Sequence, residues 1–331
     1  MQKDIQLTGI GNALVDIEFE VNDAEISALN FNKGSMTLVD AETQLKILET
    51  LGDRTHYKCS GGSAANTIIA FSSFGGKSAY KTMLGKDEFG EFYSSEFRYL
   101  GIILDAAYTD LAPTGTCFVL ISTDAERTMV TSLGATAMHS KIHINDEIIK
   151  RSEWIYIEGY KLTDPIGVEV VRHSIDIAKK YDTKIAVTFS DKFIVDVFRK
   201  DLDYVVENSD LIFCNEVEAM AYTNSSTRDE AIKNLFAMNK SIAMTLGSEG
   251  SIIKWEGETF SIPAYTAKAI DTTGAGDMFA GGFFYGITHF NDPLKAGHLA
   301  SLASSRVVSQ LGARLKESHT DLKYRILNEV K

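Results

Sequence analysis

The sequence contains little cysteine and little proline, with three cysteines and four prolines among 331 residues. Cys59, Cys117 and Cys214 lie far apart and form no CxxC pair, which argues against a structural zinc site and against a disulfide framework. Four prolines supply no Pro-rich linker or hinge. We therefore expect one large domain or two modest ones, in the reducing cytoplasm.

The sequence also lacks a membrane segment and an excess of positive charge. No apolar run approaches the roughly twenty residues of a spanning helix. Residues 1–4 lead directly into a strand-like run, without a signal peptide. Lys and Arg number 33 against 45 Asp and Glu, so the net charge is −12. An acidic surface disfavours nucleic acid and anionic membranes as partners, which directs attention to small molecules.

Two common nucleotide-binding motifs are absent. Residues 75–78 (GGKS) resemble the end of a Walker A motif, but Phe71 occupies the position of its first glycine. After the first strand-like run, 5–10, Leu14 occupies the third glycine position of a dinucleotide-binding fingerprint. A Walker-type NTPase and a Rossmann dehydrogenase are therefore disfavoured.

The pattern of segments predicts an α/β fold. From residue 142 onward strands alternate with helices, which predicts a mostly parallel sheet covered on both faces, with ligands beyond the carboxyl ends of the strands. Earlier in the chain the segments are short and rich in β-type residues. We expect these segments to form a separate small sheet that serves as a lid: 15–21, 36–39, 105–108, 116–122 and 127–131.

The stretch Asp271–Asp277, DTTGAGD, carries the most chemistry. It follows a strand-like segment, 262–270, and precedes a long apolar helix, 278–287. Glycines at a strand-to-helix turn expose backbone N–H groups beside the positive end of a helix, which is typical of a phosphate site. A carboxylate there suits a base that accepts a proton from an attacking hydroxyl. The alternative is a packing turn followed by an ordinary first-turn aspartate.

Two polar motifs nearer the N-terminus can bind hydroxyl groups. Asn12 and Asp16 follow the first strand, and Asn66 follows the glycine-rich turn 60–63. Their amide and carboxylate groups suit sugar hydroxyls. The alternatives are an Asx turn at Asn12 and capping of the following helix by Ser60 or Ser63.

Charged and histidine residues elsewhere give further candidates. Glu216 and Glu218, beside Asn215, can hold Mg²⁺ directly or through water, or can simply belong to a first helical turn. Arg127 in the lid-like region can contact phosphate or lie on the surface. His139 and His143 have helical metal-ligand spacing but no carboxylate motif, so a solvated or capping role is favoured.

Together these motifs resemble the ribokinase-like (PfkB) family of sugar and nucleoside kinases. The resemblance covers essentially the whole chain, in the family's order: Gly11–Asp16, Gly61-Gly62 with Asn66, Thr114–Cys117, Asn215 with Glu218, and Asp271–Asp277 followed by Phe279–Phe283. It implies one kinase domain over residues 1–331, with a three-layer α/β fold, a mostly parallel central sheet and a small β lid from approximately 15–40 and 105–131.

The resemblance also implies ATP-dependent transfer of the γ-phosphoryl group to an alcohol, with Mg²⁺. It makes Asp277 the general base and Gly274, Ala275 and Gly276 the anion hole. It assigns acceptor binding to Asn12, Asp16, Gly61, Gly62 and Asn66. It assigns the nucleotide to Asn215, Thr245, Gly247, Gly250, Thr272 and Gly312, and the metal to Glu218.

Within the family the chain looks most like the adenosine kinases and their bacterial relatives, which implies a nucleoside phosphorylated at its 5′-hydroxyl. We expect Met36, Leu38, Phe118 and Leu120 to sandwich a flat base, unless they form the lid's own core. Thr273 is closer to ribokinases, which adds a monovalent cation such as K⁺ to the candidate cofactors. The sequence leaves open a free sugar as acceptor, a catalytically silent binding protein, and the choice between monomer and homodimer.

Overall fold

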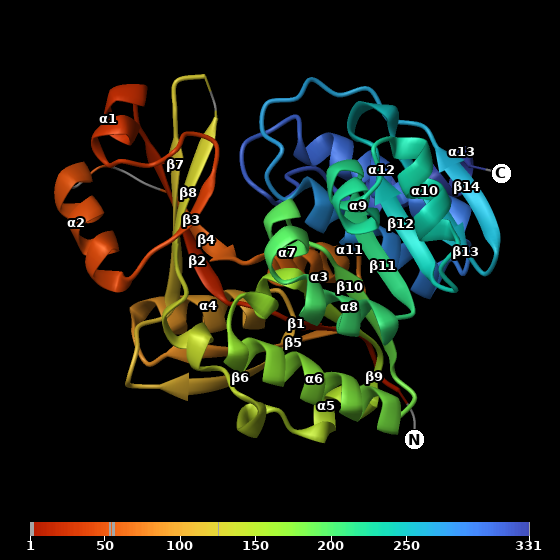
Figure 1. The fold of residues 1–331 in the computed structure, drawn as a ribbon, viewed down its shortest axis with the longest axis horizontal. Coiled ribbons are helices and arrows are strands. Elements are labelled where there is room, and N and C mark those ends of the chain that lie inside the picture. Colours follow the sequence, from red (N-terminus) through yellow and green to blue (C-terminus); the bar gives the residue numbers. More distant parts are fainter. Residues whose placement is uncertain (1–2, 53, 55–56, 125, 331) are drawn as a thin grey trace.

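The computed structural model describes residues 3–52, 54, 57–124 and 126–330. A nine-stranded sheet forms its centre, in the order β14-β13-β12-β11-β10-β9-β1-β5-β6 (Figure 1). Neighbouring strands from β12 to β6 run parallel, and the edge hairpin of β13 and β14 is antiparallel. The strands are β1 (Ile5–Ile10), β5 (Ser78–Gly85), β6 (Ile103–Thr109), β9 (Ser152–Glu158), β10 (Lys184–Thr188), β11 (Leu211–Asn215), β12 (Ser241–Thr245), β13 (Ser251–Trp255) and β14 (Glu258–Ile262).

Helices cover both faces of this sheet. Alternate strand residues project to opposite faces, so each face has its own hydrophobic core. Tyr156 belongs to one core, whereas its neighbours Ile155 and Ile157 belong to the other. The first core holds α3 (Ser63–Ser73), α4 (Glu88–Tyr99), α11 (Ala275–His289), α12 (Pro293–Val307) and α13 (His319–Glu329). The second holds α5 (Asp146–Arg151), α6 (Pro165–Lys180), α7 (Lys192–Val197), α8 (Arg199–Glu207), α9 (Glu216–Thr223) and α10 (Arg228–Phe236). The predicted three-layer α/β architecture is confirmed.

A five-stranded sheet, in the order β3-β8-β7-β2-β4, stands beside one end of the large sheet (Figure 1). Its strands are β2 (Leu14–Glu20), β3 (Met36–Leu38), β4 (Tyr57–Gly61), β7 (Gly115–Ile121) and β8 (Arg127–Ser132). Helices α1 (Asp23–Ala28) and α2 (Ala41–Leu51) cover its outer face, where Phe118 and Leu120 pack in one core with Ile26 and Ile47. The inner face of the small sheet is uncovered by these helices and is turned toward the large sheet.

Two of the predicted segments are wrong. Residues 105–108 belong to β6, which pairs with β5 at the edge of the large sheet and not with the small sheet. An edge strand is only half covered, so its short alternating pattern is the same as that of a small-sheet strand. The small sheet instead gains β4, which was not predicted. The strand expected over 262–270 ends at Ile262, and residues 263–274 form an irregular loop before α11.

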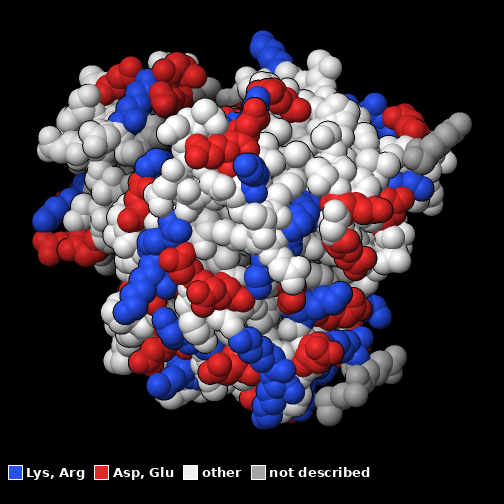
Figure 2. Space-filling model, turned by 45° about the vertical axis from the view of Figure 1, so that its right-hand side comes forward, with Lys and Arg blue, Asp and Glu red and all other residues white. Residues whose placement is uncertain are grey.

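The surface carries both signs of charge despite the net charge of −12. Figure 2 shows acidic and basic side chains interspersed across one face of the molecule. Among the described residues, none of the helices has the length and apolar character that crossing a bilayer requires.

Candidate active site

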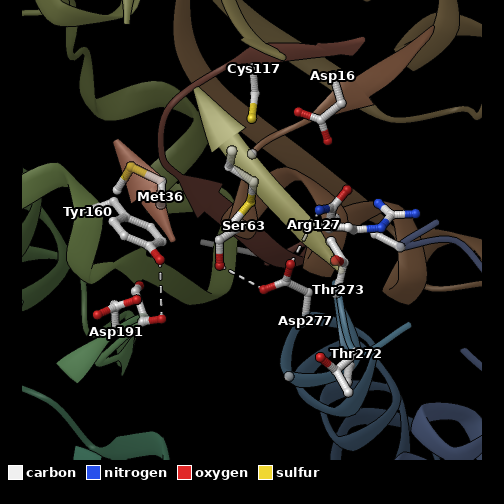
Figure 3. Close-up of a pocket in the computed structure, with 18 of the residues that line it drawn as sticks. Asp16, Met36, Ser63, Cys117, Arg127, Tyr160, Asp191, Thr272, Thr273 and Asp277 are labelled. Atoms are coloured by element: carbon white, nitrogen blue, oxygen red, sulfur yellow. Dashed lines mark hydrogen bonds between the residues drawn. The ribbon is translucent and has the colours of Figure 1, made fainter. Parts of the chain in front are cut away.

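A cavity of about 790 Å³ lies between the inner face of the small sheet and the carboxyl ends of the large sheet's strands. The residues that line it at those strand ends are Asn12 after β1, Glu158 on β9, Thr188 on β10, Asn215 on β11 and Thr245 on β12. The predicted ligand edge of the parallel sheet is therefore hollow, and most predicted site residues line it. Figure 3 shows Asp16, Thr272 and Asp277 among them.

Asp277 lies in the first turn of α11 and points into this cavity, held by two side chains of α3 (Figure 3). Ser63 Oγ donates to its Oδ1 at 2.7 Å, and Asn66 Nδ2 donates to its Oδ2 at 3.3 Å. Burial raises the pKa of Asp277 to about 6, and the two hydrogen bonds limit the rise. A carboxylate with a pKa near neutral is suited to accept a proton at physiological pH.

Ser63 was foreseen only as a possible helix cap. The structure gives the N-cap position of α3 to Gly62, which makes no side-chain cap, and leaves the Ser63 hydroxyl free to hold Asp277. The partners are 214 positions apart, so the sequence offers no local signal for this contact. Asn66 donates an amide N–H to Asp277. The side-chain carbonyl oxygen of Asn66 stays available for the acceptor molecule that Asn66 is predicted to bind.

The loop before Asp277 has the geometry of an anion site. Gly274 is the N-cap of α11 in the left-handed conformation, φ 71°, and a Cβ there would lie 2.4 Å from Cβ of Ala313. No side chain caps the helix, so its first amides and its dipole are directed to the cavity. A Cβ on Gly276 would meet nothing within 4 Å, so packing does not require this glycine and its backbone is open to a ligand.

Asp16 stands in the middle of the small sheet's inner face. Its register partners on the neighbouring strands are Cys59 and Cys117, and all three line the cavity. Burial raises the pKa of Asp16 to about 7, against the opposing charges of Arg314 and Arg127. The site predicted to bind acceptor hydroxyls therefore contains a carboxylate that is poorly solvated and ready to take hydrogen bonds.

The predicted apolar sandwich is half wrong. Met36 and Leu38 line the cavity, but Phe118 and Leu120 face the opposite side of the sheet and are buried under α1 and α2. Side chains alternate along a strand, so the neighbours of Phe118 are the ones that face inward. The small sheet's apolar cavity wall consists of Leu14, Met36, Leu38, Cys117, Val119, Met129 and Leu133.

Arg127 is buried, so the alternative that it lies on the surface is excluded. The residue is 9% exposed and lines the cavity. Its Nη2 lies 2.8 Å from Asp271 Oδ2 and its Nη1 lies 3.3 Å from Glu18 Oε1. Within the described chain, Nε and Nη2 make no directional hydrogen bond, so the guanidinium retains capacity for an anionic ligand.

Four predicted glycines lie outside the cavity wall. A Cβ on Gly61 would overlap Asp16, and a Cβ on Gly250 would lie 2.0 Å from the carbonyl oxygen of Ile262, so both are explained by packing. Gly312 donates its N–H to Asp271 Oδ2 at 2.8 Å. For Gly247, in the turn after β12, contact with a nucleotide stays a prediction, as it does for Asn215, Thr245 and Thr272, which do line the cavity.

Glu218 caps its own helix and also faces the cavity. With Asn215 it forms a capping box, in which Asn215 N donates to Glu218 Oε2 at 3.0 Å and Glu218 N donates to Asn215 Oδ1 at 2.8 Å. Burial and then the charge of Asp191 raise the pKa of Glu218 to about 7. The described residues contain no ready cluster of three His, Cys, Asp or Glu side chains for a metal. Glu218 and Asp191 both line the cavity, and two neighbouring carboxylates nevertheless fit a cation bound jointly with phosphate oxygens.

The two histidines of the 139–143 pair have different surroundings. His143 Nδ1 accepts from the backbone N–H of Ser140 at 3.1 Å, so the expected capping role is confirmed for this residue. His139 is not solvated as expected; it is 1% exposed, and burial lowers its pKa to about 2.

Comparisons with known proteins show the family to which this chain is similar. The sequence model of the pfkB family carbohydrate kinases matches residues 36–320. Adenosine kinase of Saccharomyces cerevisiae is 29% identical over 307 residues, which cover 86% of this chain and 89% of that protein. The crystal structure of adenosine kinase from Sinorhizobium meliloti is 30% identical with a TM-score of 0.89, over 97% of this chain and 99% of the other. A probable sugar kinase from Rhizobium etli is 29% identical with a TM-score of 0.90, over 98% and 99%.

Proposed function

This chain belongs to the pfkB family of carbohydrate kinases, which transfer phosphate from ATP to an alcohol, and from that premise we propose that its acceptor is the 5′-hydroxyl of adenosine. The observation that carries the proposal is the cavity itself. Two carboxylates, Asp16 and Asp277, line it together with an apolar wall of the small sheet, which supports an acceptor that has both hydroxyl groups and an apolar surface.

The transfer uses groups already described. Asp277 accepts the proton of the attacking hydroxyl, whose oxygen forms a bond to the γ-phosphorus while the bond from that phosphorus to the departing ADP oxygen breaks. Ser63 and Asn66 hold the carboxylate in place. The open amides around Gly276 and the positive end of α11 stabilise charge on the transferred phosphoryl oxygens.

The acceptor end favours a nucleoside over a free sugar. Asp16 can accept two hydrogen bonds, which suits the vicinal hydroxyls of a ribose. Beyond it, Met36, Val119 and Met129 present apolar groups, and Tyr160 lines the same cavity. A planar base gains from such a surface, whereas a free sugar would leave it wet and would lack polar partners there.

ATP and Mg²⁺ complete the proposed reaction. The chain lacks a Walker A lysine, so a cation must neutralise much of the phosphate charge. Glu218 and Asp191 would hold Mg²⁺ together with the phosphates, and Arg127 would contact a phosphate oxygen. Thr273, which also lines the cavity, would adjoin a monovalent cation if one is used.

A mixed assay tests the acceptor. Purified protein is given ATP, Mg²⁺ and equimolar adenosine, ribose and fructose, and the phosphorylated products are separated and quantified. We expect 5′-AMP to dominate by at least about tenfold, loss of turnover with a chelator, and recovery with Mg²⁺. Preferential phosphorylation of a free sugar would replace the nucleoside proposal by a sugar kinase, the activity named for the Rhizobium etli relative.

A further inference from the structure

Lys161 is a buried cation behind the acceptor end of the cavity. It lies in the short 3₁₀ segment Gly159–Thr163 and is 1% exposed. Its Nζ donates to Asn12 Oδ1 at 3.1 Å and to the carbonyl oxygen of Thr136 at 3.4 Å. A buried ammonium group is costly, and burial lowers the pKa of Lys161. The hydrogen bond from Lys161 to Asn12 therefore indicates what this buried side chain does.

Asn12 is held by its backbone and its side chain at once. Its N–H donates to Glu158 Oε1 at 2.7 Å, and its Oδ1 also accepts from Thr136 Oγ1 at 3.2 Å. An ammonium group has donors only, so the amide atom that faces Lys161 must be the oxygen. The NH₂ group of Asn12 is thereby left for the cavity that Asn12 lines.

We propose that Lys161 is a positioning residue that locks the Asn12 amide with its NH₂ toward the phosphoryl acceptor. This inference rests on the proposed function and specifies which hydrogen-bonding groups the acceptor molecule must present. Asn12 becomes a donor alone, and the ionised form of Asp16 on the next strand is an acceptor alone. The acceptor molecule must therefore present a lone pair to Asn12 and a hydroxyl proton to Asp16, and a molecule with the reverse polarity is rejected because buried polar groups stay unpaired.

A double-mutant cycle tests this coupling. In Lys161→Met the Asn12 amide can turn over, so we expect the KM for adenosine to rise about tenfold or more while the KM for ATP changes less than about twofold. Asn12→Ala removes the donor itself. If Lys161 acts through Asn12, adding Lys161→Met to Asn12→Ala changes the adenosine KM less than about twofold further. Additive losses would overturn the proposal, as would a Lys161→Met enzyme that binds adenosine normally.

Two controls separate this result from misfolding and from failure of the proposed function. Lys81→Met removes another buried lysine, which pairs with Asp105 and does not line the cavity, so the KM for adenosine should stay within about twofold. Asn12→Asp keeps a partner for Lys161 but removes the donor, so its melting temperature should match wild type while its adenosine KM rises. If wild type prefers a sugar, the proposed function fails by itself, and the same cycle run with that sugar still decides the role of Lys161.

Discussion

The Asp277 carboxylate accepts hydrogen bonds from Ser63 and Asn66, and its pKa is raised. Both properties suit it to accept a proton. The carboxylate stands beside a proposed anion site that it would otherwise repel, and the proposed proton transfer accounts for its presence there.

Asp277→Asn therefore tests the base directly. The amide has the same size and leaves the fold intact, but it cannot take the proton, so kcat should fall by about 10²–10⁴. Steady-state turnover measures the loss, and calorimetric ATP binding serves as the control that the site is still formed. A kcat within about threefold of wild type would remove Asp277 from the mechanism.

Ser63 should set the pH range in which the base works. Its hydrogen bond lowers the pKa of Asp277, so Ser63→Ala raises that pKa above about 6. The base acts when deprotonated, so activity is present above the pKa and is lost as pH falls through it. The acid limb of kcat should then move to higher pH, by up to about one unit, with turnover at pH 8 nearly kept.

Ser72→Ala is the matched control for this shift. Ser72 lies on the same helix but donates to the carbonyl oxygen of Leu100, away from the cavity. The acid limb of the kcat profile of Ser72→Ala should coincide with that of wild type. Asp16, whose pKa is raised to about 7, titrates in the same window, and Ser72→Ala leaves the surroundings of both carboxylates unchanged. An unshifted limb in Ser63→Ala would show that the observed titration does not belong to Asp277.

At the scale of elements, the small sheet packs one face in the core under α1 and α2 and turns its other face to the cavity. Phe118 on β7 is 2% exposed in the core under α1 and α2, whereas Met129 on β8 lines the cavity. Phe118→Ala should lower the free energy of unfolding by about 3–5 kcal/mol with little change in the KM for the acceptor. Met129→Ala should raise that KM and destabilise less.

Urea unfolding and acceptor kinetics on the same two proteins check this division. The two positions lie on paired strands, so each variant is the control for the other. A Phe118→Ala enzyme of wild-type stability with a raised acceptor KM would place Phe118 at the ligand after all.

These two strands also show how far sequence reasoning extends. Most strands, their approximate bounds and the polar residues that follow them can be predicted from local pattern, so Asn12 and Asn215 could be predicted to lie at one edge of the large sheet. Which face of β7 looks inward depends on α1 and α2, and the alternation alone fits either choice. Ser63 with Asp277, and Lys161 with Asn12, are joined only by the fold, so no spacing in the sequence announces them.

At the scale of the molecule, two arginines connect the small sheet to the rest. Arg127 on β8 pairs with Asp271 at the start of the DTTGAGD loop. Arg314, after α12, pairs with Glu96 on α4 and donates to the carbonyl oxygen of Ser60 on β4. The cavity lies between these connections, so a ligand that fills it should bring the small sheet and the large part together and exclude water.

Hydrogen exchange measures that closure. Adenosine together with a non-hydrolysable ATP analogue should slow amide exchange in β2, β3, β7 and β8 as well as in the 271–287 region. Helix α6, on the outer layer, should exchange at its unliganded rate. Protection confined to residues 271–287 would contradict a lid.

The late place of α11 along the chain has a consequence for biosynthesis. When the ribosome has completed β14, every strand of the two described sheets has been made, but Asp277 has not. Tyr156 and Phe213, which later pack against Phe283 and Phe284, then still lack their cover. At about 5–20 residues per second, the nascent chain passes through an interval in which it is inactive and exposes aromatic surface to chaperones and to other chains. The emergence of α11 changes both conditions together, because the same fifteen residues carry Asp277, the proposed base, and Phe283 and Phe284, which cover Tyr156 and Phe213.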